Sequence, residues 1–407
     1  MKRFFALLLL GAMLFALMPF ALAEDAGEQA EETVPVEETA YSASAGSVQT
    51  AAAKAANTAN SIAFADLRKT LVKYNYNVRA LNETSSSLDD SMEKINSGKA
   101  MLNMYLNAYS SSAEAMASAA AGSTDPNMEA IYSSLSRLWT VNKESMRSQI
   151  DSMEGQKVTV ETTQNTCNDA VNQIVKGAES LYIGILKMEL ALGDAQRGVD
   201  TLERVVKLTE KQKEIGMASD YDVESMRYQY ANAASQLDSL RYQIRTSKIT
   251  LEGMLGMELS GTVTLSTPTM PTNQEIFGID YERELSRATG RNVDVMNAEA
   301  KYNGDSADGS YESVRAAKDT FAYKFKIACL DVPEKYRLVS VAENAVTYQQ
   351  RTFEIAAKKY ELGMLSYEEY LNAQSEWEGA KTALMSAKLD LFSAYRAYIW
   401  AAQYGVV

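Results

Sequence analysis

Hydrophobic residues recur along most of this chain at the spacing of an α-helix. From Val223 to Met254, apolar side chains alternate in steps of three and four residues, which is the spacing of a coiled-coil seam. The same steps return from Tyr370 to Ala401, where large side chains alternate with alanine. Small residues let a partner helix approach while large ones fill the adjoining space. The pattern predicts long antiparallel coiled-coil hairpins whose seam residues form the core.

Breaks in this spacing divide the chain into predicted helices. They are expected over about 55–120, 127–153, from after Thr163 to Ile215, and over 220–257, 281–302, 311–361 and 366–402. The weak strand signal is the alternation of valines between Gly155 and Thr163. Residues 258–275 are interpreted as an extended connector and residues 303–309 as a loop. Pro333 is expected to kink or interrupt its helix.

A duplication stands out in the second half of the chain. Residues 214–219 read Glu-Ile-Gly-Met-Ala-Ser, and residues 361–366 read Glu-Leu-Gly-Met-Leu-Ser, at an offset of 147. Each copy supplies the capping residues of a tight helical hairpin, namely Gly216, Ser219 and Asp222 in the first copy and Gly363, Ser366 and Glu369 in the second. Glycine suits the left-handed residue that ends a helix, serine is an N-cap, and an acid three residues later completes a capping box. The helices on either side of each turn must therefore fold back on each other.

The N-terminus indicates export from the cytoplasm. Lys2 and Arg3 precede an apolar stretch that ends in the small-residue site Ala21-Leu22-Ala23, which is typical of a cleaved signal peptide. A single membrane anchor is the competing interpretation. Residues 24–40 carry seven acids and no basic residue, which is typical of a disordered lead. The predicted segments are a signal peptide (1–23), an acidic and Ala/Ser-rich lead (24–50), a first helical repeat (51–260), an extended connector (261–280) and a second helical repeat (281–407).

Composition narrows the possible functions. The net charge of −13 argues against binding to nucleic acid or to an anionic membrane surface. The chain has no histidine, which excludes Ser-His-Asp and Cys-His catalysis and most zinc sites. No phosphate-binding loop, nucleophile elbow or metal-ligand spacing is present, so we expect no enzymatic activity, no cofactor and no metal. Cys167 and Cys329 could form one bridge or remain as two buried thiols.

The duplicated turns resemble those of the TolC-like family of envelope efflux proteins. The matching stretches are Lys211–Tyr228, KQKEIGMASDYDVESMRY, and Lys358–Ser375, KKYELGMLSYEEYLNAQS, and the Ala/Leu/Tyr-rich end from Ala380 to Gly405 also matches. The resemblance implies an all-α fold with two tandem repeats of long coiled-coil hairpins, a protomer of a helical barrel with little or no β-structure. In that family three protomers close the barrel, and the turns form its periplasmic mouth.

Roles for single residues follow from the resemblance. Gly216 and Gly363 match the turn glycines, Asp222 and Glu369 match acids near the entrance, and Tyr360 matches a gate aromatic. The turns as a whole, with their exposed residues, are expected to dock an adaptor: Gly216, Met217, Ser219, Gly363, Met364 and Ser366. For the methionines and Leu365, hydrophobic capping of the turn itself is an equally open interpretation. Asn372 and Leu365 replace an acid and a basic gate partner that can occur in the family.

The membrane end departs from the family pattern. The family inserts a β-hairpin in each half, with strands of about 9–11 alternating residues. The candidate zones here, 121–127, 155–163 and 303–310, are too short or too polar for such strands. The chain therefore resembles a divergent member that lacks evident β-barrel hairpins.

The sequence supports two candidate functions. The first is a homotrimeric efflux conduit or docking component in the cell envelope, which receives solutes from an inner-membrane transporter through a periplasmic adaptor. The resemblance implies a location in the outer membrane. The alternative location is the cell surface or another extracytoplasmic site. The second is a structural coiled-coil envelope protein that keeps the hairpins without a channel. A secreted enzyme is a third possibility, which the absence of catalytic motifs does not support.

Overall fold

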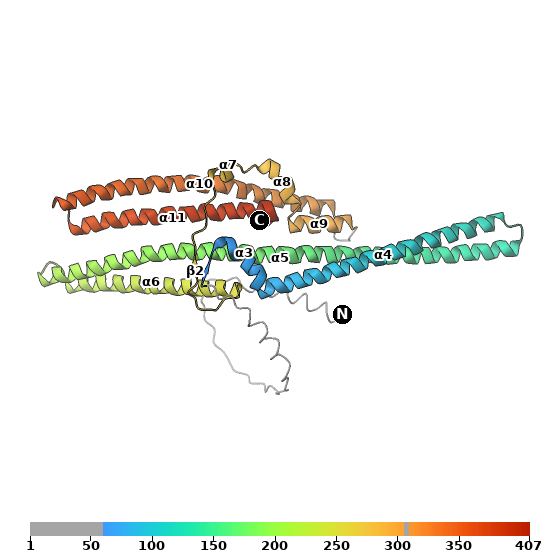
Figure 1. Cartoon of the computed structure of the whole chain (residues 1–407), viewed down its shortest axis with the longest axis horizontal. Coiled ribbons are helices and arrows are strands. Elements are labelled where there is room, and N and C mark those ends of the chain that lie inside the picture. Colours follow the sequence, from blue (N-terminus) through green and yellow to red (C-terminus); the bar gives the residue numbers. More distant parts are fainter. Residues whose placement is uncertain (1–59, 305–308) are drawn as a thin grey trace, which may run out of the picture. The chain divides into compact units, whose positions relative to one another are not determined.

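The fold is described from a computed structural model, in residues 60–304 and 309–407. The predicted signal peptide, the lead over 24–50 and part of the polar loop over 303–309 lie outside the described residues. Within them the chain forms helices α3 to α11 and only two short strands (Figure 1), which confirms the predicted all-α fold of long helical hairpins.

Among the described residues, the first half contains four helices and one strand, and the second half contains five helices and one strand. The elements of the first half are β1 (Ser61–Ile62), α3 (Phe64–Tyr74), α4 (Tyr76–Gly122), α5 (Pro126–Glu214) and α6 (Asp220–Met254). Those that follow are β2 (Thr264–Leu265), α7 (Asn273–Phe277), α8 (Tyr281–Thr289), α9 (Val293–Asn303), α10 (Tyr311–Glu361) and α11 (Tyr367–Tyr404). Strands β1 and β2 pair in parallel, with Ser61 opposite Thr264.

Three long antiparallel helix pairs dominate the contacts. They are α4 with α5, α5 with α6, and α10 with α11 (Figure 1). Helix α5 takes part in two of these pairs because its 89 residues extend about 130 Å at 1.5 Å per residue. Its N-terminal part packs on α4, and its C-terminal part packs on α6. The turn after Gly122 and the turn after Glu214 therefore lie at opposite ends of α5.

The predicted seams are buried or half-buried throughout. None of the ten predicted positions between Val223 and Met254, and none of the ten between Tyr370 and Ala401, is exposed. Two predicted interruptions are wrong, since α5 continues through Gly155–Thr163 and α10 continues through Pro333; a kink at Pro333, the other expectation, stays a prediction. Val158 is buried beside Gly304, so packing favours the helix over its β-branched preference. Val332, next to the proline, is fully buried and helps to hold α10 in place.

Two buried asparagines break helices where the sequence pattern predicts continuity. The side-chain oxygen of Asn75 caps α4, and its amide group donates to the carbonyl of Met254 at the end of α6 over 2.8 Å. Asn292 caps α9 in the same way and donates to the carbonyl of Gly405 at the end of α11 over 2.9 Å. Each asparagine thus joins the start of one helix to the end of another. The ends of α6 and α11 are themselves closed by Gly256 and Gly405, which have φ values of 64° and 69°.

The two halves meet where α5 packs against α11. Arg396 of α11 makes a two-pronged ion pair with the buried carboxylate of Glu179 on α5, at 2.8 and 3.0 Å. Trp400 donates its indole N–H to the same carboxylate over 2.8 Å. Further along, Lys187 pairs with Asp390, and Arg197 donates to Thr382. Residue numbers rise on one helix as they fall on the other, so α5 and α11 are antiparallel.

A buried carboxylate also organises the segment after α6. Glu252 is 1% exposed and accepts hydrogen bonds from the amides of Gly261, Thr262 and Val263 at 2.7 to 3.0 Å. The Ser260 hydroxyl adds a fourth bond. Burial alone would raise the pKa of Glu252, but the hydrogen bonds to its charged form outweigh burial and lower it. The negative charge therefore stabilises the path of the chain toward β2.

Both cysteines are free and buried in the described structure. Burial raises the pKa of the Cys167 thiol, and burial together with the nearby Glu284 carboxylate raises the pKa of Cys329 to about 12. Of the two possibilities left open by the sequence, the structure shows the free thiols.

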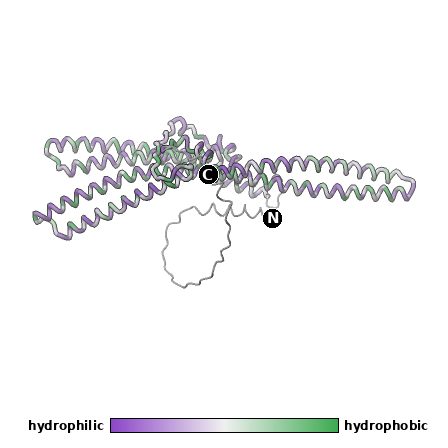
Figure 2. Tube along the Cα trace, turned by 60° about the horizontal axis from the view of Figure 1, so that its bottom comes forward, coloured by the Kyte–Doolittle hydropathy of each residue, from purple (hydrophilic) through white to green (hydrophobic). Residues whose placement is uncertain are grey.

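Hydrophilic and hydrophobic residues are interleaved along the long helices (Figure 2). In the part of the chain that the structure describes, no helix combines enough length and apolar character to cross a membrane. The long helices bury their apolar stripes against one another instead, as the seams require.

Candidate docking site at the helical hairpin turns

The first candidate turn links α5 to α6 through a Schellman motif. The Met217 amide donates to the carbonyl of Gln212 over 2.7 Å, and the Gly216 amide donates to the carbonyl of Lys213 over 2.9 Å. Gly216 has a φ of 77°, in the left-handed region that favours glycine. The sequence therefore closes α5 at the turn without help from tertiary contacts.

The second turn, between α10 and α11, repeats this backbone geometry. The Met364 amide donates to the carbonyl of Lys359 over 2.8 Å, and the Gly363 amide donates to that of Tyr360 over 2.9 Å. Gly363 has a φ of 69°. At both glycines an added Cβ would meet no atom within 4 Å, so these positions need glycine for its conformation and not for space.

The predicted entrance acids both act as helix caps in the structure. Asp222 accepts from the hydroxyl and the amide of Ser219 at 2.7 and 2.8 Å, and Glu369 does the same with Ser366 at 2.7 and 2.9 Å. The serine hydroxyls in turn accept from the amides of these acids, which completes two capping boxes. The hydroxyl and amide of Ser219 lower the pKa of Asp222, and the amide and hydroxyl of Ser366 lower that of Glu369. Both acids therefore carry their negative charge at the outer surface of the turns.

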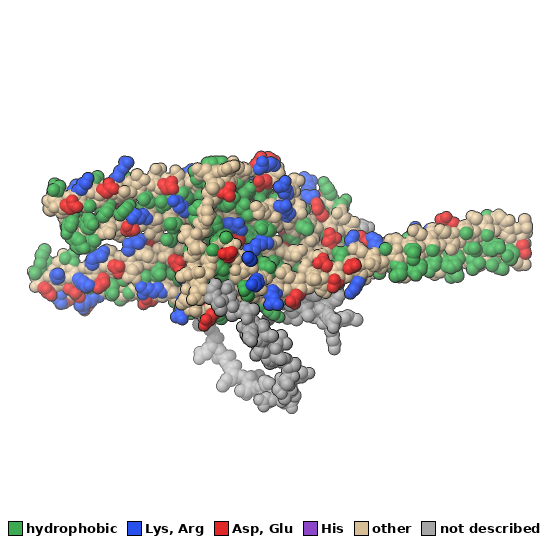
Figure 3. Space-filling view, in the orientation of Figure 1, with side chains coloured by type: hydrophobic (Ala, Val, Ile, Leu, Met, Phe, Trp, Pro, Cys, Tyr) green, Lys and Arg blue, Asp and Glu red, His purple; other side chains and the backbone are tan. Residues whose placement is uncertain are grey.

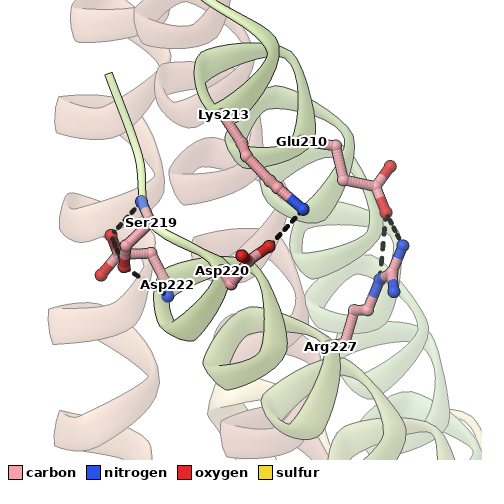
Figure 4. A network of polar contacts seen from close by, with 6 residues as sticks. All are labelled: Glu210, Lys213, Ser219, Asp220, Asp222 and Arg227. Atoms are coloured by element: carbon pink, nitrogen blue, oxygen red, sulfur yellow. Dashed lines mark hydrogen bonds and ion pairs between the residues drawn. The ribbon is translucent and has the colours of Figure 1, made fainter. Parts of the chain in front are cut away.

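Charged side chains surround the first turn (Figure 4). Lys213 on α5 pairs with Asp220 at the start of α6. One turn further from the tip, Arg227 on α6 donates through two nitrogens to Glu210 on α5, at 2.6 and 3.1 Å. These pairs are exposed, so each contributes little to stability. They give the first tip a polar surface with both signs of charge.

Aromatic rings take the place of these charges at the second turn. The ring of Tyr360 lies 5.1 Å from that of Tyr370 and 5.8 Å from that of Tyr367, measured between centroids. Phe353 and Trp377 extend the stack along the α10–α11 seam. Tyr360, the predicted gate aromatic, is 40% exposed and packs within its own hairpin. The two tips thus share a backbone design and differ in chemistry.

Methionine is exposed at each tip. Met217 is 75% exposed and Met364 is 71% exposed, whereas Leu365 is half-buried. Such exposure argues that the methionines do not cap their own turns, which was the alternative interpretation. Met side chains adapt their shape to many apolar partners, so exposed methionines suit a docking surface. Leu365, in contrast, fits the interpretation as a hydrophobic contact within the turn.

Both tips lie at the same end of the α5–α11 pair. This follows because α5 runs toward its turn, α11 runs away from its own, and the two helices are antiparallel through Glu179–Arg396 and Arg197–Thr382. Between them lies a hollow of about 260 Å³ that is lined from α5 by Val205 and Leu208 and from α11 by Leu371 and Tyr367, among others. The arrangement places two exposed turns and an apolar-lined hollow on one end of the protein.

Sequence reasoning found the turn residues but missed their surroundings. The Lys213–Asp220 pair spans the turn at a distance of seven positions, which no helical i to i+4 rule selects. The buried Glu179 and its half-buried partner Arg396 lie 217 positions apart, so only the packed structure shows this pair. Within the described residues, no group of three or more His, Cys, Asp and Glu side chains could hold a metal ion.

No protein-family model matches the chain, and a search of curated proteins finds no match. Among solved structures, the chain is similar to the Campylobacter jejuni CmeC outer membrane channel, with 14% identity, a TM-score of 0.42, and coverage of 63% of this chain and 68% of that chain. The outer membrane protein VceC from Vibrio cholerae is also 14% identical, with a TM-score of 0.41 and coverage of 63% and 75%.

A third similar structure is the open state of the MtrE outer membrane channel from Neisseria gonorrhoeae, with 14% identity, a TM-score of 0.38 and coverage of 63% and 72%. CmeC and MtrE are outer membrane channels. At such identities and TM-scores, the function of this chain has to be argued from its own hairpins.

Proposed function

We propose that the protein is an envelope efflux conduit or docking component that works as a homotrimer. In this role it receives solutes from an inner-membrane transporter through a periplasmic adaptor. The observation that carries the proposal is the pair of exposed hairpin turns at one end of the α5–α11 pair, each closed by the same glycine and capping box. Two rigid tips with one backbone design are suited to contact repeated helical features of a partner.

The chemistry of the tips supports docking by apolar contact. Met217 and Met364 add flexible apolar side chains to the two turns, while Asp222 and Glu369 hold negative charge close by. In a ring of three protomers the acids would be present six times, and such a ring would favour cations at the mouth. Passage of solute would be passive, with the energy supplied by the transporter.

A structural role without a channel is the second candidate. It is favoured by the α4–α5 pair, which continues as a two-helix coiled coil far beyond the region where α9 packs on α5. A long helical rod is a common way to span distance in an envelope without forming a lumen.

The oligomeric state tests the conduit. The mass of the purified exported protein would be measured by light scattering, with and without detergent. A mass of three chains supports the proposal, and a monomer in both conditions rejects the conduit.

Docking is tested separately in cells that lack the native copy of the gene. Export of a fluorescent dye would be compared between the native protein and a variant with Met217→Asp and Met364→Asp. We expect dye to accumulate in the variant cells at equal protein level. Tyr323→Asp, which changes a 69% exposed residue on α10 away from the tips, serves as the matched control and should export dye normally. Equal export by all three proteins would contradict a docking role for the tips.

A further inference from the structure

The α4–α5 pair beyond Gly98 has an ordered seam of its own. Ser136 on α5 donates to the carbonyl of Ala113 on α4 over 3.0 Å, and the rings of Tyr109 and Trp139 stack at 5.5 Å. These contacts define the register between α4 and α5. Seam residues on both helices are buried or half-buried, among them Leu102, Leu106, Tyr109 and Ala113 on α4 and Tyr132, Ser136 and Trp139 on α5.

The residue directly before a seam residue is often apolar and exposed. On α4 these are Met101 and Tyr105, joined by Met104, and on α5 they are Ile131, Leu135 and Leu138, joined by Met128 near the tip. We call these seven residues the distal stripe. Their exposed fractions range from 37% to 61%. Figure 3 shows the hydrophobic side chains gathered over this hairpin.

Residues directly after the seam are polar instead. They include Asn103, Asn107 and Glu114 on α4, and Arg137, Thr140 and Glu144 on α5. In two antiparallel right-handed helices that share a seam, the residues directly before the seam residues of both helices lie on one face of the pair. The residues directly after the seam residues lie on the opposite face. The hairpin therefore has one apolar face, which is the distal stripe, and one polar face opposite to it.

The spacing of the distal stripe indicates a helical partner. On α5 the stripe positions follow steps of three and four from Met128 to Leu138, and a further step of three reaches Val141, which is also exposed. Narrow seams with these steps pack against other helices. Residues 100–136 contain no Lys or Arg, so the region lacks the basic residues that usually accompany binding to a membrane surface.

Size complementarity favours a second copy of the same hairpin. At the level of Leu135 and Leu138 on α5, the α4 residues that directly precede the seam are small, namely Ser112 and Ala115. A ridge of large side chains thus lies beside a shallow strip of small ones, and the ridge of one copy fits the strip of another. The stripe leaves roughly 700 Å² exposed if a large side chain carries about 200 Å². A stable interface of standard size buries about 800 Å² on each partner.

We infer that the distal stripe is an assembly surface that packs against the α4–α5 hairpin of a second copy of this chain. The number of copies is that of the proposed trimer, so the inference rests on the proposed function in this respect. It adds a contact far from the turns, because the distal stripe lies toward the opposite end of α5 from Glu214.

Sedimentation equilibrium of the full exported chain, without detergent, tests this surface. The native protein is compared with Leu135→Glu/Leu138→Glu on the distal stripe and with Arg137→Glu/Thr140→Glu on the polar face as the matched control. We expect the stripe variant to need at least a tenfold higher concentration to associate, and the control to behave as the native protein does. Circular dichroism of all three proteins confirms that the helices are retained.

The outcomes separate this surface from the proposed function. A native trimer whose association is the same in the stripe variant overturns the surface and leaves the conduit standing. A native protein that stays monomeric at every concentration overturns both. Flotation with phosphatidylcholine vesicles that is lost in the stripe variant, with unchanged mass, shows a lipid partner and also overturns the inference.

Discussion

Three glycines of the last hairpin provide a quantitative test of the structure. Gly363 and Gly405 both have a φ of 69°, whereas Gly379 lies within α11. An added Cβ would meet nothing within 4 Å at Gly363 or Gly379, but at Gly405 it would overlap the backbone carbonyl of Arg291. Alanine at the three positions therefore separates conformational strain from close packing, in one hairpin and with one chemical change.

The expected costs differ in sign and size. Gly379→Ala should stabilise the protein by about 0.5–1 kcal/mol, because alanine loses less entropy than glycine in a helix. Gly363→Ala should destabilise it by about 1 kcal/mol, the cost of a left-handed alanine. Gly405→Ala adds overlap worth about 1–3 kcal/mol and disturbs the bond from Asn292, so we expect a total of about 3–5 kcal/mol.

Urea unfolding followed by circular dichroism and by tryptophan fluorescence would measure these values. Trp400 is 1% exposed and lies five positions before Gly405, so its fluorescence reports on the same end of α11. Gly363→Asn is a useful additional variant because asparagine tolerates the left-handed region, and its cost should be smaller than that of alanine. If Gly405→Ala costs no more than Gly363→Ala, the close approach of α11 to the start of α9 is refuted.

Four further predictions concern the buried and capping groups. Arg396→Met should cost about 3–5 kcal/mol in urea unfolding because it leaves the buried Glu179 without its ionic partner, and methionine at both positions should recover most of the loss. Glu252→Gln should be less stable than the native protein at pH 7. The pKa of Glu252 is lowered in the folded protein, so its contribution to the free energy of unfolding is fully present above the ordinary carboxyl pKa of about 4.3. This contribution is lost as the pH falls through the folded pKa, so the difference in stability between the two proteins should close in acid. A difference that stays constant with pH would contradict the role of the carboxylate. Ser366→Ala should cost about 1 kcal/mol and speed hydrogen exchange in the first turn of α11, whereas unchanged exchange would contradict the cap. The Cys329 thiol, with its pKa raised to about 12 by burial and Glu284, should react with a thiol reagent at pH 8 only as the protein unfolds, and fast labelling of the folded protein would count against its burial.

The sequence predicted the capping residues of the turns because their interactions are local. The Schellman motif at Gly216 and the capping box of Ser219 and Asp222 involve residues within six positions of one another. Each of these bonds depends on backbone propensity and short side chains, so pattern and chemistry suffice to predict them. The same holds for the seams, since steps of three and four residues define a helical face wherever the partner helix comes from.

Features that depend on distant contacts escaped the sequence pattern. The strand signal at Gly155–Thr163 gave way to a helix because Val158 packs beside Gly304, and the helix breaks at Asn75 and Asn292 depend on carbonyls of α6 and α11. The exposed distal stripe was also hidden, because apolar residues at helical spacing are read as core until the structure shows that nothing covers them.

The sequence by itself determined the helical class, the hairpin turns and the faces that the helices bury, since each is set by interactions within a few residues. Only the tertiary structure decided that α5 packs against α11, where α4 and α9 begin, and that both turns lie at one end of the α5–α11 pair. It also decided the ionic contact between Glu179 and Arg396. The physical reason is that the free energy of a contact between residues 217 positions apart depends on the packing of everything between them, which no local pattern encodes.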